Sequence, residues 1–304
     1  MTTEAFSLEA YLEQGAHRAG EALERALDDL APLLTPELEP VVRHGVLGGG
    51  KRLRPILCAT AYRQVHGATE PPEAAWDLAA SLELIHAYSL MHDDLPCMDD
   101  AALRRGHPTT HRVHGVPATV RAGAALIPAA ALHAWRVTGR LGLGESRRRE
   151  TVRTLMQAAG GAGMVGGQVL DLQAEGRQLT EDELTDLHAR KTGALLAASV
   201  RLGGLAGGAD DDMLKALEAY GRAVGLAFQI ADDVLDATAT AEALGKEPSD
   251  ADLEKSTYVS LWGVQGARTR ARDVAGGAVA ALRRRGLEDP ALVALADYVV
   301  ARDR

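Results

Sequence analysis

The sequence predicts an all-α protein, a single-domain bundle of ten or more helices, and three observations support this class. Ala, Leu, Glu and Arg, which all favour helix, dominate the composition. The runs typical of strands are scarce, since aromatic residues make up only 4% of the chain. Apolar residues recur at helical spacing along most segments. Because no repeat, low-complexity segment or linker divides the 304 residues, one domain spanning 1–304 is expected.

The first third of the chain predicts four helices. Residues 8–30 form an amphipathic pattern that a proline closely follows. A second helix is expected from TPELEP, with Thr35 as its cap, and it ends at the glycine-rich segment 48–55. ILCATAYRQVHGA predicts a third helix. The fourth, from Ala74 to about Leu95, is apolar and leads into a cluster of aspartates.

The remaining two thirds predict six more helices after a loop at GHPTTHRVHG. Joints rich in Gly, Asp and Thr separate them. Thr180 followed by Glu183 is the pattern of a capping box at one helix start. The expected helices cover residues 117–140, 147–174, 180–205, 210–236, 256–284 and 290–302.

Composition excludes several classes of function. The formal net charge of -9 argues against nucleic acid as a partner. The start of the chain lacks the basic and apolar regions of a signal peptide, and no apolar run is long enough to span a membrane. The two cysteines, Cys58 and Cys97, form no disulfide or metal pattern. A cytoplasmic protein without membrane insertion is therefore expected.

Four aspartates crowd into the segment 91–100, MHDDLPCMDD. Like charges repel and Asp is a poor helix former, so a cation or a phosphorylated ligand should offset the cost. Asp93 and Asp99 lie about 240° apart on an ideal helix, whereas Asp93 and Asp100 share a face. Because Pro96 should distort the helix between them, spacing leaves Asp99 and Asp100 both open.

A second acidic cluster lies at FQIADDVLD, residues 228–236. Asp232 and Asp236 are about 40° apart around a helix, so both carboxylates can reach one cation, while Asp233 points elsewhere. A solvated acidic patch is the alternative, but unpaired acids are costly in such apolar surroundings. Hard carboxylate oxygens without Cys or His ligands favour Mg²⁺ over zinc.

Basic residues provide the complementary charge. GGGKRLRP places Lys51, Arg52 and Arg54 on a glycine-flanked turn, where the backbone can approach an anion closely. Any one basic residue alone is more often a solvated surface charge, so only their joint occurrence indicates a phosphate site. The others are Arg104, Arg105, Lys191, Lys246 and Lys255.

A series of motifs follows along nearly the whole chain: GGKRLRP, LIHAYSLMHDDLPCMDD, LRRGHPTTH, GGQVLDLQAEG, KTGALL, FQIADDVLD, LGK and KSTY. Each is weak or moderate alone. In this order and spacing they resemble the trans-isoprenyl diphosphate synthases, the short-chain polyprenyl synthetase family, of the bacterial farnesyl and geranylgeranyl type. The resemblance implies the type I isoprenoid synthase fold, with the two Asp-rich motifs facing each other across a central cavity, and a homodimer.

The resemblance also implies roles for the matching residues. A magnesium cluster on the allylic diphosphate would be held by Asp93, Asp99 and Asp232, with support from Asp94 and Asp236. The analogy with the family thus favours Asp99 over Asp100. The allylic diphosphate would be bound by Arg104, Lys191 and Lys246. Isopentenyl diphosphate would be bound by Lys51, Arg54, His86 and Arg105. The reaction centre would be lined by Gln168, Asp171, Thr192 and Gln229.

The implied reaction condenses isopentenyl diphosphate with an allylic diphosphate, either dimethylallyl or geranyl. Magnesium and cationic side chains would stabilise the departing diphosphate. The double bond of isopentenyl diphosphate would attack the allylic carbocation, and the released diphosphate would take the final proton. Helices rich in Ala and Leu can line the dry cavity that this chemistry needs.

Product length depends on what blocks the growing tail. Tyr88 precedes Asp93 by five residues, about 7.5 Å along the helix axis, at a position that resembles the cavity floor of the family. An aromatic residue there implies farnesyl diphosphate (C15), although Ser89 leaves room beside it. PCMDDAALRRG also resembles some geranylgeranyl (C20) synthases, which carry a small residue where Tyr88 stands. We expect C15, with C20 as the alternative.

Rival classes fit the sequence less well. His86 ends an E-x-x-H motif, but a di-iron bundle would need a second such motif; packing in the core is its plainer alternative. A class I terpene cyclase would not need both the second Asp-rich motif and GGKRLRP. A silent partner subunit typically loses aspartates, and this chain keeps both motifs. The chain departs from the family pattern at Arg121, Ala124 and Val259, and its run of aspartates gives way to Ala101 and Ala102 after Asp100; none of these residues is assigned to metal or diphosphate.

Overall fold

The computed structural model describes residues 6–238 and 256–301, and these residues are almost entirely helical, which confirms the all-α class. Their packing groups into two compact units. Unit 1 comprises Met1–Leu155 and Leu202–Gly208, and unit 2 comprises Met156–Arg201 and Ala209–Arg304. The single domain spanning 1–304 stays a prediction. No helix of the described residues is long and apolar enough to cross a membrane.

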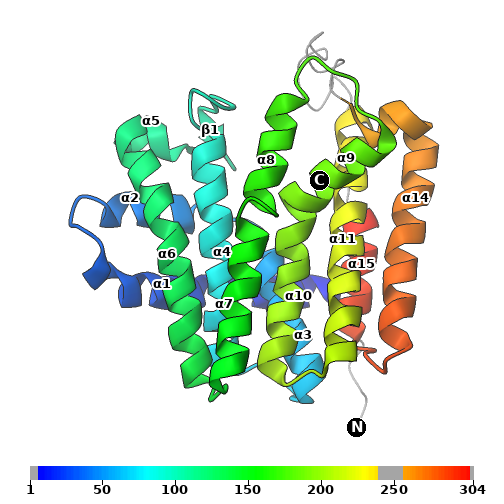
Figure 1. Ribbon diagram of the computed structural model, residues 1–304, viewed down its shortest axis with the longest axis horizontal. Coiled ribbons are helices and arrows are strands. Elements are labelled where there is room, and N and C mark those ends of the chain that lie inside the picture. Colours follow the sequence, from blue (N-terminus) through cyan, green and yellow to red (C-terminus); the bar gives the residue numbers. More distant parts are fainter. Residues whose placement is uncertain (1–5, 239–255, 302–304) are drawn as a thin grey trace. The chain divides into compact units, whose positions relative to one another are not determined.

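Unit 1 is built around α4 (Glu73–Asp93), which packs against α1, α2, α3 and α6. α4 is buried on every side from Ala75 to Ile85, and it lacks the amphipathic period of a surface helix. Figure 1 shows it running beside α6 and ending next to the strand β1. The other elements are α1 (Leu8–Leu30), η1 (Ala31–Leu33), α2 (Glu39–Leu47), α3 (Leu53–His66), β1 (Leu103–Arg104), β2 (His107–Pro108), α5 (Thr110–His114), α6 (Val116–Arg140) and most of α7 (Glu145–Ala159).

Unit 2 is built around α11 (Asp211–Thr238), which packs along α14 (Tyr258–Arg283) and α15 (Pro290–Ala301). The fully buried Tyr220 donates its hydroxyl to the Leu292 carbonyl of α15 at 2.6 Å. The remaining elements are α8 (Met164–Gln173), α9 (Glu181–His188), the π-helical turn η2 (Ala189–Gly193) and most of α10 (Ala194–Gly207).

Several helix boundaries follow the sequence prediction. The Thr180–Glu183 capping box is present, and α9, η2 and α10 follow one another without a break, as expected for 180–205. The N-cap of α14 is Thr257, whose hydroxyl accepts from Ser260. The first helix ends at Leu30, as its pattern predicts.

Three local predictions are wrong. Thr35 does not cap α2, because its carbonyl closes a separate turn with Leu38 and the helix begins at Glu39. GHPTTHRVHG is not a plain loop, since it contains β2 and α5. The expected helix 147–174 is two helices, α7 and α8, because the chain breaks at the glycines around Gly160 and Gly163.

The close approach of α10 and α11 predicts a stability effect. A Cβ on Gly221 would lie 2.6 Å from Ala197 Cα and 2.8 Å from Val200 Cγ2. Gly221→Ala should therefore lower the free energy of unfolding by roughly 1–3 kcal/mol, measured by chemical denaturation. The control is Gly276→Ala on α14, where a Cβ meets no atom within 4 Å. It should stabilise by about 0.5–1 kcal/mol, and equal effects at both glycines would contradict this account.

Candidate active site

The first acidic cluster begins at the end of α4, whose last residue is Asp93. The chain then turns, because Pro96 lacks the N–H needed to continue the helix and disfavours helical backbone at the residue before it. The turn brings the backbone N–H of Asp99 to the carbonyl of Asp93 at 2.9 Å. Asp99 therefore lies beside Asp93 even though the two are out of phase on an ideal helix.

Asp100 faces a different neighbour. Its backbone is in the left-handed region, with φ 44°. Its carboxylate lies 3.3 Å from the guanidinium of Arg112 and 3.9 Å from His111 Nε2. The structure thus separates the two aspartates that the spacing left open, with Asp99 next to Asp93 and Asp100 turned toward α5.

Asp94 is buried and paired with Arg104 of β1. Arg104 Nε donates to both carboxylate oxygens at 2.8 and 3.0 Å, and another guanidinium nitrogen lies 2.6 Å from Oδ1. This hydrogen bonding raises the pKa of Arg104, while Asp93 and Asp99 add smaller increases. A cavity of about 50 Å³ is lined in part by Asp94, Arg104 and Arg105. The carboxylate of Asp94 therefore fixes the side chain of Arg104.

The glycine-rich turn before α3 is held against the same region. Arg105 donates to the carbonyl of Gly49, and a Cβ on Gly50 would collide with the Arg105 guanidinium. Lys51 is exposed on this turn, and Arg54 lies in the first turn of α3. The structure thus gathers Lys51, Arg54 and Arg105 around one turn of unit 1.

The electrostatics of this basic group suit an anion. Burial lowers the pKa of Arg54, with Glu83 opposing and Arg105 adding to the shift. Burial lowers the pKa of His86 well below its usual value, and four arginines add to the effect, Arg54 most strongly. The buried Nε of Arg54 has no hydrogen-bond partner within the described part of the chain. An unpaired buried donor is costly, and a negatively charged oxygen atom would be a suitable acceptor for it.

Tyr88 and Ser89 lie on α4 ahead of Asp93. The Tyr88 side chain is buried and packs edge-on against His92, with ring centroids 5.1 Å apart. Burial raises the pKa of Tyr88, and Asp93 adds a smaller increase, which places the ring near that carboxylate. The Ser89 hydroxyl donates to the His86 carbonyl at 2.9 Å, so it is bonded within its own helix.

The departures from the family pattern lie on exposed or peripheral positions. Arg121 and Ala124 are exposed on α6. Between them, Gly123 faces the His92 ring so closely that a Cβ there would collide with it. Val259 is half-buried and packs at the edge of an apolar cluster in unit 2.

The second acidic cluster lies near the end of α11 in unit 2. Asp232 is half-buried and Asp236, one turn later, is exposed. Asp233 Oδ2 accepts the backbone N–H of Tyr258 at 2.6 Å, a contact that joins α11 to the start of α14. Gln229 is half-buried one turn before Asp233.

Lys191 and Thr192 lie on the π-helical turn η2, a distortion that is frequent at functional sites. Lys191 Nζ lies 2.5 Å from Asp171 Oδ2 of α8. The buried Oε1 of Gln168 has no hydrogen-bond partner among the described residues. The turn packs on α11 through glycines, since a Cβ on Gly225 would lie 2.7 Å from Gly193 Cα. Lys246 lies outside the described residues.

Sequence reasoning gave Glu83 no role and counted Arg52 only among the basic residues that indicate a phosphate site. Both are buried, and Arg52 pairs with Glu83 at 2.7 Å. Glu83 is the glutamate of the E-x-x-H motif noted in the sequence. Sequence alone does not distinguish a carboxylate that pairs with an arginine from one that binds a metal.

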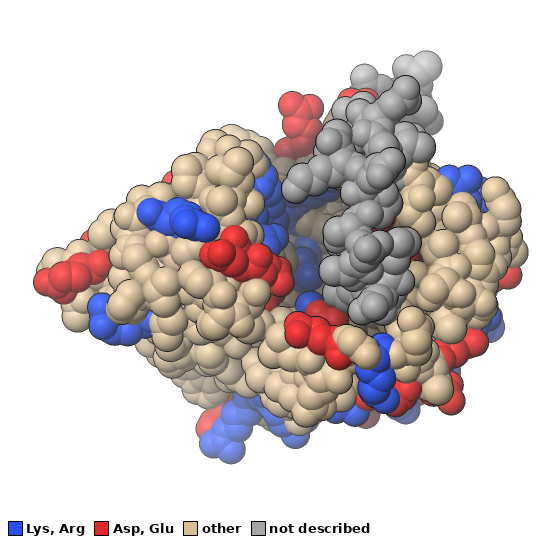
Figure 2. Space-filling model, turned by 90° about the horizontal axis from the view of Figure 1, so that it is seen from above, with Lys and Arg blue, Asp and Glu red and all other residues tan. Residues whose placement is uncertain are grey.

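The face drawn in Figure 2 carries Lys and Arg side chains and also Asp and Glu side chains. Among residues 6–238 and 256–301, no three His, Cys, Asp or Glu side chains form a ready metal cluster. The side chains of Asp93 and Asp99 in unit 1 are hard carboxylate donors, a type of ligand that suits Mg²⁺ better than a softer metal.

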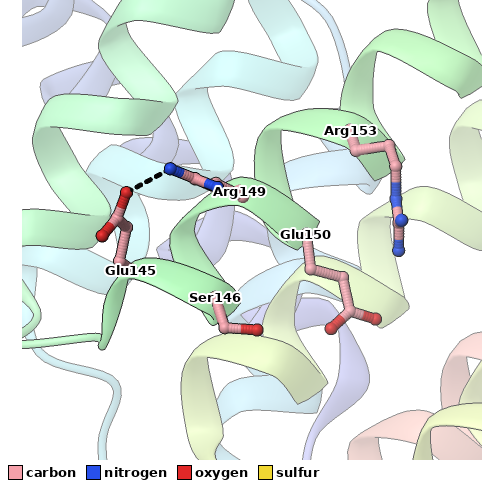
Figure 3. Close-up of a pocket in the computed structure, with 5 residues that line it drawn as sticks. All are labelled: Glu145, Ser146, Arg149, Glu150 and Arg153. Atoms are coloured by element: carbon pink, nitrogen blue, oxygen red, sulfur yellow. Dashed lines mark hydrogen bonds and ion pairs between the residues drawn. The ribbon is translucent and has the colours of Figure 1, made fainter.

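A larger hollow lies elsewhere on unit 1, along α7. It measures about 480 Å³ and is lined by Glu145, Ser146, Arg149, Glu150 and Arg153, all from one helix (Figure 3). Arg149 and Glu145 pair across one helical turn at 2.5 Å. None of these residues matches a site motif, so size alone does not make this hollow the active site.

Comparison with known proteins identifies related sequences and folds. The profile of the polyprenyl synthetase family matches residues 35–281. The chain is 41% identical to the farnesyl diphosphate synthase of Escherichia coli (strain K12) over 301 residues, 96% of this chain and 98% of that one. It is 39% identical to the chloroplastic geranylgeranyl pyrophosphate synthase of Catharanthus roseus, over 99% of this chain and 83% of that one. A solved structure of an FPP/GFPP synthase from Zymomonas mobilis has a TM-score of 0.81 and 34% identity, covering 97% of this chain and 99% of that one.

Proposed function

This chain belongs to the polyprenyl synthetase family and is a prenyltransferase, and we propose that its main product is farnesyl diphosphate. The substrates are isopentenyl diphosphate and an allylic diphosphate, dimethylallyl or geranyl. Relatives include both farnesyl and geranylgeranyl diphosphate synthases, so family membership leaves the product length open.

The observation that carries the C15 product is the buried ring of Tyr88, five residues before Asp93 on α4. A prenyl tail whose diphosphate is held at Asp93 would extend along this helix. The ring stands about 7.5 Å along the axis from that carboxylate. It is packed against His92, so rotation away from the tail would lose that contact.

The basic group of unit 1 binds isopentenyl diphosphate. Arg54 offers its unpartnered buried Nε, and Arg105 and Lys51 add charge from the neighbouring turns. His86 is neutral beside these arginines, because burial and their charge lower its pKa. It can therefore donate one hydrogen bond to a diphosphate oxygen without carrying a charge.

The allylic diphosphate is held by Arg104, Lys191 and Lys246, with Arg104 fixed by Asp94. Asp93, Asp99 and Asp232 would hold Mg²⁺, with Asp94 and Asp236 in support. When bound, the metal neutralises the charge that develops on the departing diphosphate. Gln168, Asp171, Thr192 and Gln229 line the reacting carbons, and the released diphosphate accepts the proton lost after the new carbon–carbon bond forms.

Metal removal tests the carboxylate sites. Treatment of the purified enzyme with a chelator should abolish turnover, and added Mg²⁺ should restore it, because cationic side chains alone leave much of the diphosphate charge uncompensated. Calorimetric titration of Mg²⁺ in the presence of an allylic diphosphate should show uptake. Full activity after exhaustive chelation would contradict the assigned metal role.

Product analysis tests the product length. The protein is incubated with Mg²⁺, isopentenyl diphosphate and dimethylallyl diphosphate, and the products are dephosphorylated and sized by mass spectrometry. Farnesol as the main product supports the proposal. Geranylgeraniol would replace it with the geranylgeranyl diphosphate synthase alternative. We also propose a homodimer, which light scattering of the same preparation would test.

A further inference from the structure

Glu83 is an unusual neighbour for an anion site. It lies on α4, one turn before His86, and only 3% of its surface is exposed. Burial lowers the pKa of both Arg54 and Arg105, and the charge of Glu83 opposes that lowering, so Glu83 lies within electrostatic reach of both. By electrostatic repulsion alone, a carboxylate in this position should weaken diphosphate binding. Its presence therefore points to a second role that offsets this cost.

The direct partner of Glu83 is Arg52. One guanidinium nitrogen of Arg52 lies 2.7 Å from Glu83 Oε1, and the other donates to the Val46 carbonyl of α2 at 3.1 Å. Arg52 is itself buried, with 8% of its surface exposed. These two contacts join α2, α4 and the glycine-rich turn at one side chain.

The backbone of Arg52 is held in an unfavourable conformation. Its φ of 50° lies in the left-handed region, which a residue with a Cβ rarely adopts. Arg52 also precedes α3 as its N-cap, and its carbonyl accepts the N–H of Ile56 at 3.1 Å. The side-chain contacts of Arg52 therefore help to fix the path of the chain from the glycines into α3.

This path sets where the binding groups stand. Lys51 immediately precedes Arg52, and Arg54 follows it in the first helical turn. Arg105 rests against the same turn through Gly49 and Gly50. A shift at Arg52 would therefore displace three groups that bind the diphosphate.

We propose that Glu83 is a positioning residue for the isopentenyl diphosphate site, acting through its buried ion pair with Arg52. The inference rests on the proposed function, since it assigns a partner to residues of that same site. Arg52, which donates to Glu83 and to the Val46 carbonyl, serves as the structural arginine of the group. Arg54 and Arg105 remain available for the ligand.

The test compares Glu83→Gln with a matched control, Asp77→Asn. Asp77 lies on the same helix, is equally buried, and pairs with Arg25 at 2.7 Å away from the binding group. Glu83→Gln should raise the KM for isopentenyl diphosphate by about tenfold or more, and the KM for the allylic substrate by less than about twofold. Asp77→Asn should change neither KM, although both variants should lower the unfolding temperature.

The direction in which Glu83→Gln changes the affinity for isopentenyl diphosphate distinguishes a positioning role from a purely electrostatic one. If Glu83 acts only as a negative charge, Glu83→Gln should tighten the binding of isopentenyl diphosphate, measured by calorimetry without primer, and the proposal would be overturned. Should that variant fail to fold, Arg52→Lys keeps the charge while losing the paired contacts. It should raise the same KM selectively, and an unchanged KM would equally overturn the proposal.

A double variant tests whether Glu83 and Arg52 act together. The single variants Glu83→Gln and Arg52→Gln are compared with the double variant Glu83→Gln/Arg52→Gln. The loss of isopentenyl diphosphate affinity in the double variant should not exceed the larger of the two single losses, whereas additive losses would contradict action through Arg52. The wild-type protein is assayed alongside. No elongation by the wild type would overturn the proposed function, whereas normal elongation with an unaffected Glu83→Gln variant would overturn this inference alone.

Discussion

Asp93→Asn is expected to lower kcat by about a hundredfold to a thousandfold, because the substitution removes one negative charge from the carboxylates that would hold Mg²⁺ on the leaving diphosphate. Asp93 ends α4, and the Asp99 backbone donates to its carbonyl rather than to its side chain. The exchange should therefore leave the turn intact. Steady-state kinetics with saturating substrates and titrated Mg²⁺ would measure the loss.

Asp100→Asn is the matched control for this substitution. It changes the same residue type within the same segment, but at a carboxylate that faces Arg112 and is 57% exposed. An exposed ion pair contributes little to stability, so kcat should change by less than about twofold. Equal losses in the two variants would contradict the division of the cluster into a metal-binding Asp93–Asp99 pair and a structural Asp100.

Tyr88→Ala is expected to change the main product from farnesyl to geranylgeranyl diphosphate or longer. Removing the buried ring opens space on α4 along the proposed path of the tail, and each added isoprene unit can then occupy it. Mass spectrometry of the dephosphorylated products would measure the shift. The free energy of unfolding of the variant should also fall by roughly 3–5 kcal/mol, the usual cost of truncating a buried aromatic residue to alanine. The assay is therefore run well below the unfolding temperature of the variant.

Ser89→Ala is the control for product length. Ser89 is next to Tyr88, and its hydroxyl donates to the His86 carbonyl of its own helix. Removing that hydroxyl opens almost no space, so the product distribution should stay at C15. An unchanged product in Tyr88→Ala would remove Tyr88 as the floor of the tail path.

Much of the fold could be predicted from sequence because helices depend on local patterns. The capping box at Thr180 and Glu183 involves residues three positions apart, and it is present in the structure. The sequence predictions failed at positions where the local pattern favours one structure and packing with distant parts of the chain favours another. The end of α7 falls among small, apolar residues that continue a helical pattern, and only the packing of the folded chain decides that it breaks near Gly160.

Sequence motifs could propose members of the candidate site but not how they are arranged. Helical geometry could not choose between Asp99 and Asp100, because the choice depends on a turn that follows α4 rather than on the helix itself. The ion pair of Arg52 and Glu83 joins residues 31 positions apart. No periodicity connects them, so only the folded structure shows that the two side chains are paired.

The most direct test of the central claim is the stoichiometry of diphosphate release. The purified protein is given Mg²⁺, dimethylallyl diphosphate and isotopically labelled isopentenyl diphosphate, and released diphosphate is compared with label incorporated into longer prenyl chains. A prenyltransferase should release one diphosphate for every isopentenyl unit incorporated. Diphosphate release from the allylic substrate without incorporation would contradict the account and indicate cyclase-like or hydrolytic chemistry.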